Sequence, residues 1–345
     1  MQVERVVVAA PRGFCAGVEK AIKALDWMTR VFAAPVYCYH EIVHNQFVVN
    51  HFRSLGVIFV DDVRDVPHGA PVMLSAHGSP PSVIEAAQAN GGTVVDAVCP
   101  LVTKVHHELK VRSRKGYTVL YVGHEGHEEA VGTMAVAPDA VHLIQTTQDI
   151  DALRGQAGPF ALLSQTTLSM DEWQHLRTYA EEVFPEIWMP NRSDLCFATT
   201  NRQGALRAIA GTADAVVVIG SANSSNTVAL TKVAEAAGCE RVYRVNGVHE
   251  LPDDLSGVVA VTAGASAPES LVLEVIAALD PSGGVTEADF TVEDEYFPPP
   301  PELRELLRAL GSVLDVALGA PTPSQFDAQS DREFTAAQVL ASASR

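Results

Sequence analysis

Positive charge is scarce in this sequence. The 345 residues include 24 Lys and Arg against 42 Asp and Glu, which gives a formal net charge of −18 at pH 7. Affinity for the phosphate backbone of nucleic acids comes from clustered Lys and Arg, so the composition argues against a general nucleic-acid-binding protein. A small anionic ligand remains compatible, because backbone N–H groups, hydroxyls and histidines bind anions at helix N-termini without a net positive field.

Long hydrophobic runs and abundant cysteine are missing as well. No stretch approaches the roughly 18 consecutive apolar residues that cross a bilayer, so no membrane partner is expected. The N-terminal run MQVERVVVAAPRG contains an acid and no cleavage pattern, so we expect no signal peptide and a cytoplasmic location. In a reducing cytosol, the odd count of five cysteines favours metal ligands or bystander thiols over disulfides.

The sequence does contain short β-branched runs that alternate with longer amphipathic stretches, from residue 3 to about residue 280. This alternation is typical of an α/β protein with buried, mostly parallel strands covered by helices. We expect strands at residues 3–10, 36–39, 72–75, 93–98, 118–122, 160–163, 215–219 and 258–262, and helices at residues 19–31, 83–89, 103–114, 171–184, 202–210, 229–237 and 270–279.

The spacing of the junctions suggests three similar sections, each with one cysteine at a strand-to-helix junction. These cysteines are Cys15, Cys99 and Cys196. We therefore expect three small α/β lobes around a shared centre, at residues 1–96, 97–192 and 193–311. The Pro-, Ser- and Gln-rich composition that follows predicts a flexible tail at residues 312–345.

Polar and reactive side chains follow the predicted strands. The junctions read PRGFCAG, SAHGSPP, AVCPLVTK, GHEGHEE, SQTTLS, GSANSSNT and AGASAPES. In open α/β sheets, ligands bind beyond the carboxyl ends of the strands, so these junctions are the expected site. GSANSSNT lacks the GK[ST] ending of a phosphate loop and PRGFCAG lacks GxGxxG spacing, so neither ATP nor NAD is expected as the primary ligand.

Each junction cysteine lies at or near a predicted helix start, where the helix N-terminus lowers the pKa of a thiol and favours the thiolate that binds metal. Taken singly, each is equally well explained as a small buried hydrophobe, which is the interpretation we favour for Cys38 and Cys239. Three thiolates suit either zinc with one open position or a 4Fe-4S cluster with one iron that lacks a protein thiolate. No CxxC pair is present to decide between them.

Histidines recur beside predicted strand ends, at His44, His77 and His127. A capping role explains one such histidine, whereas three of them near hydroxyl-rich junctions indicate an anion pocket. Glu129 suits a proton source, or else a solvated acid at a helix start. Thr166 suits a hydrogen bond to a substrate hydroxyl, or else an ST-turn or N-cap.

Several motifs together resemble the 4-hydroxy-3-methylbut-2-enyl diphosphate reductase family in order and spacing, over roughly residues 3–310. They are PRGFCAGVEKAI, HEIVHNQFVV, SAHG, CPLVTKVH, GHEGHEEAVGTM, SQTTLS, CFATTNRQ, GSANSSN and TAGASAPE. This family catalyses the last step of the methylerythritol phosphate route to isoprenoids. It removes the substrate hydroxyl with two electrons and two protons, giving isopentenyl and dimethylallyl diphosphates. The resemblance implies three α/β lobes around a central iron-sulfur cluster.

The resemblance also implies site residues. It implies one 4Fe-4S cluster on Cys15, Cys99 and Cys196, whose open fourth iron takes the substrate hydroxyl. It assigns proton supply to Glu129 and orientation of the hydroxyl to Thr166, and it implies a ferredoxin or flavodoxin as electron donor. The implied diphosphate ligands are His44, His77, His127, Ser224, Ser225, Asn226 and Ser266, of which His127 also counts among the catalytic residues.

Some positions depart from the motifs usual in this family. They are Ala10 before PRGFC, Tyr39 before HEIVHN, Ala222, and the run TVA at residues 227–229. Such changes leave open a paralogue with an altered preference among allylic diphosphates or an altered electron donor. Two hypotheses of other classes also stay open, a cluster-binding sensor without turnover and a zinc hydrolase of a phosphorylated substrate.

Overall fold

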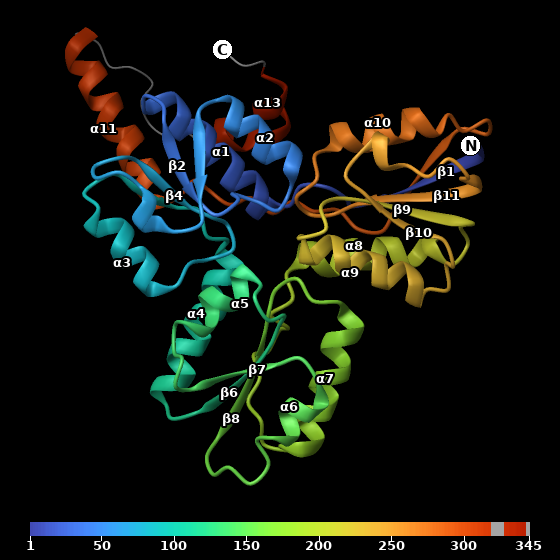
Figure 1. Ribbon diagram of the computed structural model, residues 1–345, viewed down its shortest axis with the longest axis horizontal. Coiled ribbons are helices and arrows are strands. Elements are labelled where there is room, and N and C mark those ends of the chain that lie inside the picture. The colour runs from blue at the N-terminus through green and yellow to red at the C-terminus, as the bar shows by residue number, and fades with distance from the viewer. Residues whose placement is uncertain (319–327, 343–345) are drawn as a thin grey trace. The chain divides into compact units, whose positions relative to one another are not determined.

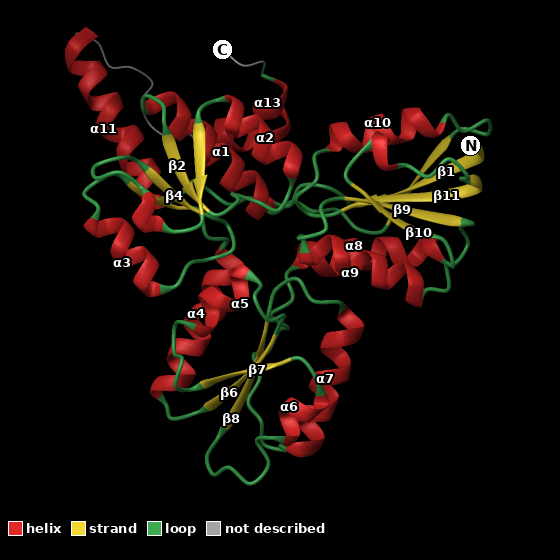
Figure 2. Ribbon diagram, viewed as in Figure 1, coloured by secondary structure: helices red, strands yellow, loops and turns green. Residues whose placement is uncertain are grey.

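The computed structural model describes residues 1–318 and 328–342. The chain is α/β, as predicted, and every strand pairing in the three described sheets is parallel. Two compact units are distinguished. Unit 1 comprises Met1–Cys15, His44–Gln46 and Leu101–Asp294, and unit 2 comprises Ala16–Val43, Phe47–Pro100 and Glu295–Arg345. Figure 1 labels the elements and Figure 2 separates helices from strands.

Unit 1 contains a five-stranded sheet in the order β10-β9-β11-β1-β12. Its strands are β1 (Gln2–Ala10), β9 (Ala215–Ile219), β10 (Val242–Val245), β11 (Ser256–Ala263) and β12 (Val285–Asp289). Helix α10 (Glu269–Leu279) packs on one face, and α8 (Phe197–Ala210) and α9 (Ser225–Ala236) pack on the other (Figure 1). The short 3-10 helix η2 (Val248–Glu250) follows β10. The continuous apolar run AVVVI of β9 is fully buried, as a central parallel strand requires.

A second sheet in unit 1 has the order β7-β6-β8. Its strands are β6 (Thr118–Val122), β7 (Val141–Ile144) and β8 (Phe160–Ser164). Helices α4 (Pro100–Arg114) and α5 (Glu128–Met134) supply the core of one face, where Val105 and Leu109 pack with Val119. Helices α6 (Thr147–Asp151) and α7 (Met170–Val183) supply the other, where Leu176 packs with Leu120.

Unit 2 contains the sheet β3-β2-β4-β5. Its strands are β2 (Val36–Tyr39), β3 (Val57–Val60), β4 (Val72–Leu74) and β5 (Val94–Asp96). Its helical segments are α1 (Ala16–Val31), α2 (Gln46–Ser54), η1 (Val63–Asp65), α3 (Pro81–Ala89), α11 (Pro301–Leu318), α12 (Ala328–Glu333) and α13 (Ala336–Ala341). None of the helices among the described residues has the length and apolar character needed to cross a membrane.

The three sheets differ from the expected lobes at the N-terminus. β1 does not pair with β2–β5 but lies between β11 and β12, with Val6 opposite Val259 and Val285. The apolar side chains of β1 are buried on both faces, and an interior position in the five-stranded sheet provides cover on both. Residues 2–10 therefore belong to a different sheet from the other strands of the expected 1–96 section.

The expected flexible tail at residues 312–345 is partly helical, although residues 319–327 and 343–345 lie outside the described residues. Asp331 of α12 is 8% exposed and accepts hydrogen bonds from Lys23 Nζ at 2.8 Å and from the Tyr296 hydroxyl at 2.7 Å. A capping box between Thr335 and Gln338 begins α13. The contacts of Asp331 with residues distant in sequence and the local cap of α13, which composition does not reveal, hold the segments that are described.

Candidate active site

Loops at the carboxyl ends of β1, β6, β8, β9 and β11 carry most of the predicted site residues, and all of these strands belong to unit 1. The loops are linked by hydrogen bonds between residues distant in sequence. Cys15 N donates to Ala265 O at 3.2 Å, and Cys196 N donates to Thr166 O at 3.0 Å. The strand-to-helix junctions of this unit thus form one polar region, whereas the predicted junctions after β4 and β5 belong to unit 2.

Cys15 and Cys196 are free, partly buried thiols of this region. Cys15 immediately precedes α1, and Cys196 is the N-cap of α8, where its Sγ accepts the Thr199 N–H at 3.3 Å. The Thr199 hydroxyl lies 3.0 Å from the same sulfur. Both thiols therefore lie at helix starts, as expected from the sequence.

The expected lowering of the thiol pKa by a helix N-terminus is wrong for Cys196. Burial, followed by the neighbouring Cys15, raises its pKa to about 12, and the hydrogen bonds from Thr199 only oppose this rise. The loss of hydration therefore raises the pKa of Cys196 by more than the N-terminus of α8 lowers it. A neutral thiol results at pH 7, and the thiolate form here needs a cation to stabilise it, as in a metal-thiolate bond.

Arg202, to which the sequence analysis gave no role, ties the Cys15 loop to helix α8. Its guanidinium is fully buried and donates to Gly13 O at 2.7 Å and 3.0 Å and to Phe14 O at 3.1 Å. It also pairs with Glu293 at 2.9 Å. Gly13 has φ +65°, and a Cβ there would lie 3.0 Å from Ala267 O, so glycine suits this turn. Arg202 stands six residues after Cys196 within CFATTNRQ, which is the only sequence signal for it.

Glu129 and Thr166 form a buried pair. Thr166 N donates to Glu129 Oε1 at 2.6 Å, and the Thr166 hydroxyl donates to Oε2 at 2.9 Å. Glu129 is 2% exposed. Burial raises its pKa to about 7, and the nearby Asp194 adds to the rise. The carboxyl is therefore about half protonated at neutral pH, as suits a proton donor. The alternative of a solvated helix-start acid is excluded by the burial.

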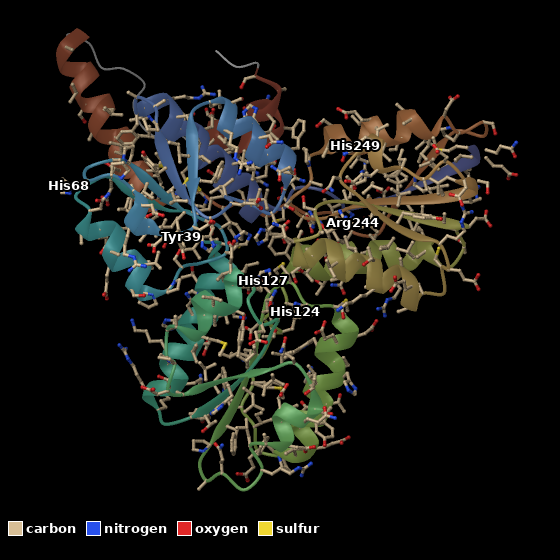
Figure 3. The ribbon with its side chains drawn as sticks, in the orientation of Figure 1. Tyr39, His68, His124, His127, Arg244 and His249 are labelled. Atoms are coloured by element: carbon tan, nitrogen blue, oxygen red, sulfur yellow. The ribbon has the colours of Figure 1, made fainter. Side chains whose placement is uncertain are left out.

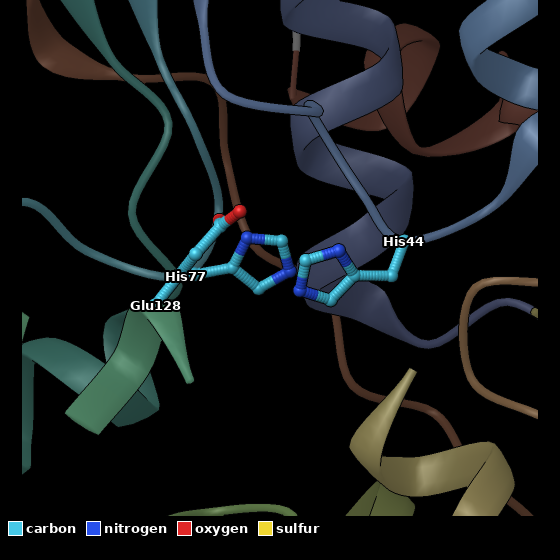
Figure 4. A group of neighbouring side chains, drawn as sticks. All are labelled: His44, His77 and Glu128. Atoms are coloured by element: carbon cyan, nitrogen blue, oxygen red, sulfur yellow. The ribbon is translucent and has the colours of Figure 1, made fainter. Parts of the chain in front are cut away.

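His127 and His44 approach each other within unit 1, with ring centroids 5.7 Å apart. His127 lies at the N-terminus of α5 (Figure 3), where its Nδ1 accepts the Glu129 N–H at 3.1 Å. His44 Nδ1 lies 3.4 Å from the amide nitrogen of Asn223. An imidazole that accepts at Nδ1 carries its proton on Nε2 when neutral, so both rings present Nε2–H donors. Figure 4 draws His44 and Glu128, which belong to unit 1, and His77, which belongs to unit 2.

The predicted hydroxyl and amide ligands also lie in this region of unit 1. Ser224 is the N-cap of α9, and Ser266 donates to His44 O at 2.9 Å. Asn226 Oδ1 accepts Ala265 N at 3.0 Å, while its amide donates to the Thr199 hydroxyl at 3.3 Å. These bonds fix Ser266 and Asn226 beside the loops that carry His44 and Cys196.

Gln165, which the sequence analysis also left without a role, joins three of these loops. It is fully buried, and its Oε1 accepts the His124 N–H at 3.0 Å. Its amide donates to the Thr167 hydroxyl at 3.0 Å and to Ser225 Oγ at 3.1 Å. The junction motif SQTTLS contained it, but nothing in the motif distinguishes Gln165 from its threonines.

Cys99 and His77 belong to unit 2, where they occupy adjacent loops after β5 and β4. Cys99 N donates to Ala76 O at 3.0 Å, next to His77. Val98 O accepts a hydrogen bond from Lys20 Nζ at 2.8 Å, and this lysine is buried. Unit 2 thus presents one thiol and one imidazole from neighbouring strand ends.

A cavity of about 410 Å³ lies in unit 1 beside the histidines and serines of the site. Three of the positions that depart from the family motifs line it, namely Ala222, Val228 and Ala229. His127 and Ser225 also line it. The departures therefore give part of this cavity an apolar wall. The residues that line it are His124, Glu125, Gly126, His127, Glu172, Ala222, Asn223, Ser225, Val228, Ala229 and Lys232.

Residues 6–280 match the family model described as LytB protein. A curated protein from Rhodopirellula baltica, named 4-hydroxy-3-methylbut-2-enyl diphosphate reductase, is 45% identical over 306 residues, which cover 87% of this chain and 96% of that protein. A protein of the same name from Corynebacterium diphtheriae is 44% identical over 308 residues, covering 87% and 92%.

Solved structures agree with these sequence matches. The E-1-hydroxy-2-methyl-but-2-enyl-4-diphosphate reductase from Plasmodium falciparum superposes with a TM-score of 0.85 at 30% identity, covering 90% of this chain and 99% of that one. A second structure, titled as the terminal enzyme of the non-mevalonate pathway, gives a TM-score of 0.58 at 28% identity and covers 80% of this chain and 99% of that one.

Proposed function

The chain belongs to the LytB protein family, and on that premise we propose that it reductively removes the hydroxyl group of 4-hydroxy-3-methylbut-2-enyl diphosphate. Substrate, two electrons and two protons give water and either isopentenyl or dimethylallyl diphosphate. The observation that carries this proposal is the buried Glu129–Thr166 pair, in which the carboxyl is about half protonated at neutral pH and Thr166 O accepts a hydrogen bond from Cys196 N. A cluster-binding sensor or a structural protein has no need for such a group.

We propose that Cys15, Cys99 and Cys196 hold one 4Fe-4S cluster with one iron open. The donor set supports this assignment, because two of the thiols lie on loops of unit 1 that hydrogen bonds through Asn226 join, and the third follows a strand end in unit 2. Thiolates are the usual ligands of such clusters. When bound, the cluster would supply both electrons and a Lewis acid, its open iron. Zinc would supply a Lewis acid but no electrons.

In this proposal, Glu129 holds the proton that leaves with the substrate hydroxyl as water. The Thr166 hydroxyl donates a hydrogen bond to Glu129 Oε2 and so fixes the orientation of the Glu129 carboxyl. When substrate is bound, the same hydroxyl can donate to the substrate hydroxyl instead. The burial of both groups limits competing water. His127 acts beside them, because its Nδ1 anchors the first turn of the helix that carries Glu129.

We propose a diphosphate site made of neutral donors. His44 and His127 present Nε2–H groups, which bind phosphate oxygens without a permanent positive charge. Because these donors are neutral, a diphosphate can bind to them although the chain as a whole has a net charge of −18. The full set is His44, His77, His127, Ser224, Ser225, Asn226 and Ser266.

The electron source is proposed to be a ferredoxin or flavodoxin. The five cysteines form no disulfide among the described residues, which suits a reducing compartment, and we propose that this compartment is the cytoplasm.

Replacing Gln165 with Met is expected to raise KM for the diphosphate about tenfold while lowering kcat less. The substitution keeps the side-chain volume but removes the amide donor to Ser225 Oγ and the acceptor of the His124 N–H. A tenfold rise in KM corresponds to a loss of about 1.4 kcal/mol of binding free energy, which is the size expected for these hydrogen bonds. Steady-state kinetics with varied substrate measures the split. Gln174→Met, on the exposed face of α7, is the matched control and should behave as wild type. Equal kinetics for the two variants would remove Gln165 from the site.

The proposed function is tested by anaerobic purification followed by metal and sulfide analysis and by substrate-dependent oxidation of reduced methyl viologen. A brown protein with about four iron and four sulfide per chain and diphosphate-dependent oxidation supports the enzyme. A protein with zinc and no sulfide contradicts the cluster. An intact cluster without substrate-dependent oxidation supports the sensor instead.

A further inference from the structure

Helix α1 buries two lysine side chains. Lys20 is 7% exposed and Lys23 is 4% exposed. Lysine is rarely buried without a charged partner, because an unpaired ammonium group loses its hydration and gains nothing in return. The burial of each lysine therefore needs a partner that accounts for it.

Lys23 has a carboxylate as its partner. Its Nζ pairs with Asp331 Oδ2 at 2.8 Å and donates to Asp331 O at 2.5 Å. Asp331 is itself buried, and both residues belong to unit 2. The two opposite charges lie together and are hydrogen-bonded, so the burial of Lys23 is accounted for.

Lys20 has only a neutral partner. Its Nζ donates to Val98 O at 2.8 Å. No carboxylate lies within ion-pair distance of this nitrogen in the parts of the chain that the structure describes. A carbonyl oxygen takes one of the three N–H donors of an ammonium group and leaves its positive charge uncompensated.

The carbonyl that Lys20 contacts belongs to the peptide bond between Val98 and Cys99, so the ammonium group is fixed at the backbone of a proposed cluster ligand. Three other hydrogen bonds already hold this loop. Ala97 N and Cys99 N each donate to a backbone carbonyl at 3.0 Å, and Val98 N donates to Asp96 Oδ1 at 2.9 Å. A structural tie could be made by a neutral donor, and it does not explain a buried positive charge at this place.

We propose that Lys20 is a positioning residue for charge, whose ammonium group, fixed at the Cys99 loop, stabilises the reduced state of the proposed cluster. This inference rests on the proposed function, in which Cys99 is one of the three ligands of that cluster. Reduction transfers one electron from an external reductant, which is oxidised, and makes the centre more negative by one charge.

The physical reason is the attraction between opposite charges away from water. A buried positive charge attracts the more negative, reduced state more strongly than the oxidised state, and salt screens a buried charge far less than an exposed one. Net charge and hydrogen bonding around a cluster are among the factors that set its reduction potential. Lys20 should therefore raise this potential and make the first electron easier to accept.

The test is a redox titration of the anaerobically reconstituted holoenzyme with dithionite, followed by the electron paramagnetic resonance signal of the reduced cluster. Lys20→Met and Lys20→Gln remove the charge, and Lys20→Arg keeps it. Lys110→Met removes an exposed lysine of α4 and is the control. Iron and sulfide content and far-UV circular dichroism are measured on the same samples.

We expect the two neutral Lys20 variants to bind the electron at least tenfold more weakly than wild type, which lowers the potential of a one-electron couple by about 59 mV or more. Lys20→Arg and Lys110→Met should stay within about threefold of wild type. The shift should persist at high ionic strength, because the Lys20 side chain is buried.

The proposal is overturned if a neutral variant that holds the cluster keeps the wild-type potential. It is also overturned if Lys20→Arg shifts as far as Lys20→Met, because disturbed packing would then explain the change. Failure of both neutral variants to assemble any cluster would assign Lys20 to assembly instead. A wild type that holds the cluster but does not turn over substrate contradicts the reductase function alone, since the potentials can still be compared.

Discussion

The Glu129→Gln variant is expected to lose about 10²–10⁴-fold in kcat while it keeps its cluster and its affinity for the diphosphate. Glutamine keeps the shape of the side chain and still accepts the Thr166 N–H, but it holds no acidic proton. Anaerobic turnover with dithionite and methyl viologen measures the rate, and iron analysis measures the cluster. Glu235→Gln, on the exposed face of α9, is the control and should match wild type. A Gln variant as fast as wild type would mean that another group supplies the proton.

The same variant has a pH signature. Burial raises the pKa of Glu129 from 4.5 to about 7, so wild-type kcat should fall as the pH rises above about 7, while the residual rate of the variant should not show this step.

The raised pKa also affects stability, because the folded chain binds the Glu129 proton more tightly than the unfolded chain. The associated stabilisation is therefore complete below pH 4.5 and is lost as the pH rises through 7. At about 1.4 kcal/mol per pKa unit, it amounts to roughly 3 kcal/mol, so Glu129→Gln should unfold at a higher temperature than wild type at pH 8.

The Arg202→Met variant is expected to lose most of its cluster and about 1.5–3 kcal/mol of stability, the range for a hydrogen bond to a charged group. The substitution leaves Gly13 O and Phe14 O without the guanidinium donors and leaves the partly buried Glu293 with Asn201 Nδ2 as its donor, so the Cys15 loop is no longer held against α8 by this arginine. Iron and sulfide content after anaerobic reconstitution is the main measurement, with far-UV circular dichroism to separate cluster loss from unfolding.

Two further variants sharpen this test. Arg207→Met removes an exposed arginine from the same helix, where it pairs with Asp171, and should keep a full cluster. Arg202→Lys keeps the charge opposite Glu293 but not the forked donors to the two carbonyls, so its iron content should fall between those of wild type and Arg202→Met. Wild-type iron content in Arg202→Met would show that the Cys15 loop is held without this arginine.

The central strands were predictable because their signal is local. Residues 118–122 and 215–219 were expected as strands and form β6 and β9 with the same bounds. β12 was not expected, since its sequence VTEAD is mostly exposed and lies at the edge of the sheet, where polar residues are tolerated. The position of β1 between β11 and β12 depends on pairing across more than 250 residues, which periodicity does not encode.

The candidate site was predictable as a set of junction motifs rather than as an arrangement. Motifs at strand ends singled out Cys196, Glu129 and Thr166, which hydrogen bonds join in the structure. The structure adds what spacing cannot give. Burial reverses the expected direction of the Cys196 pKa, and two residues without an assigned role, Gln165 and Arg202, connect the loops.

The account is tested most directly by the electron and product balance of the wild-type enzyme. Anaerobic holoenzyme with 4-hydroxy-3-methylbut-2-enyl diphosphate and reduced methyl viologen should oxidise two viologens for each isopentenyl or dimethylallyl diphosphate detected by mass spectrometry. An intact cluster that yields neither product, or viologen oxidation without loss of the substrate hydroxyl, would contradict it.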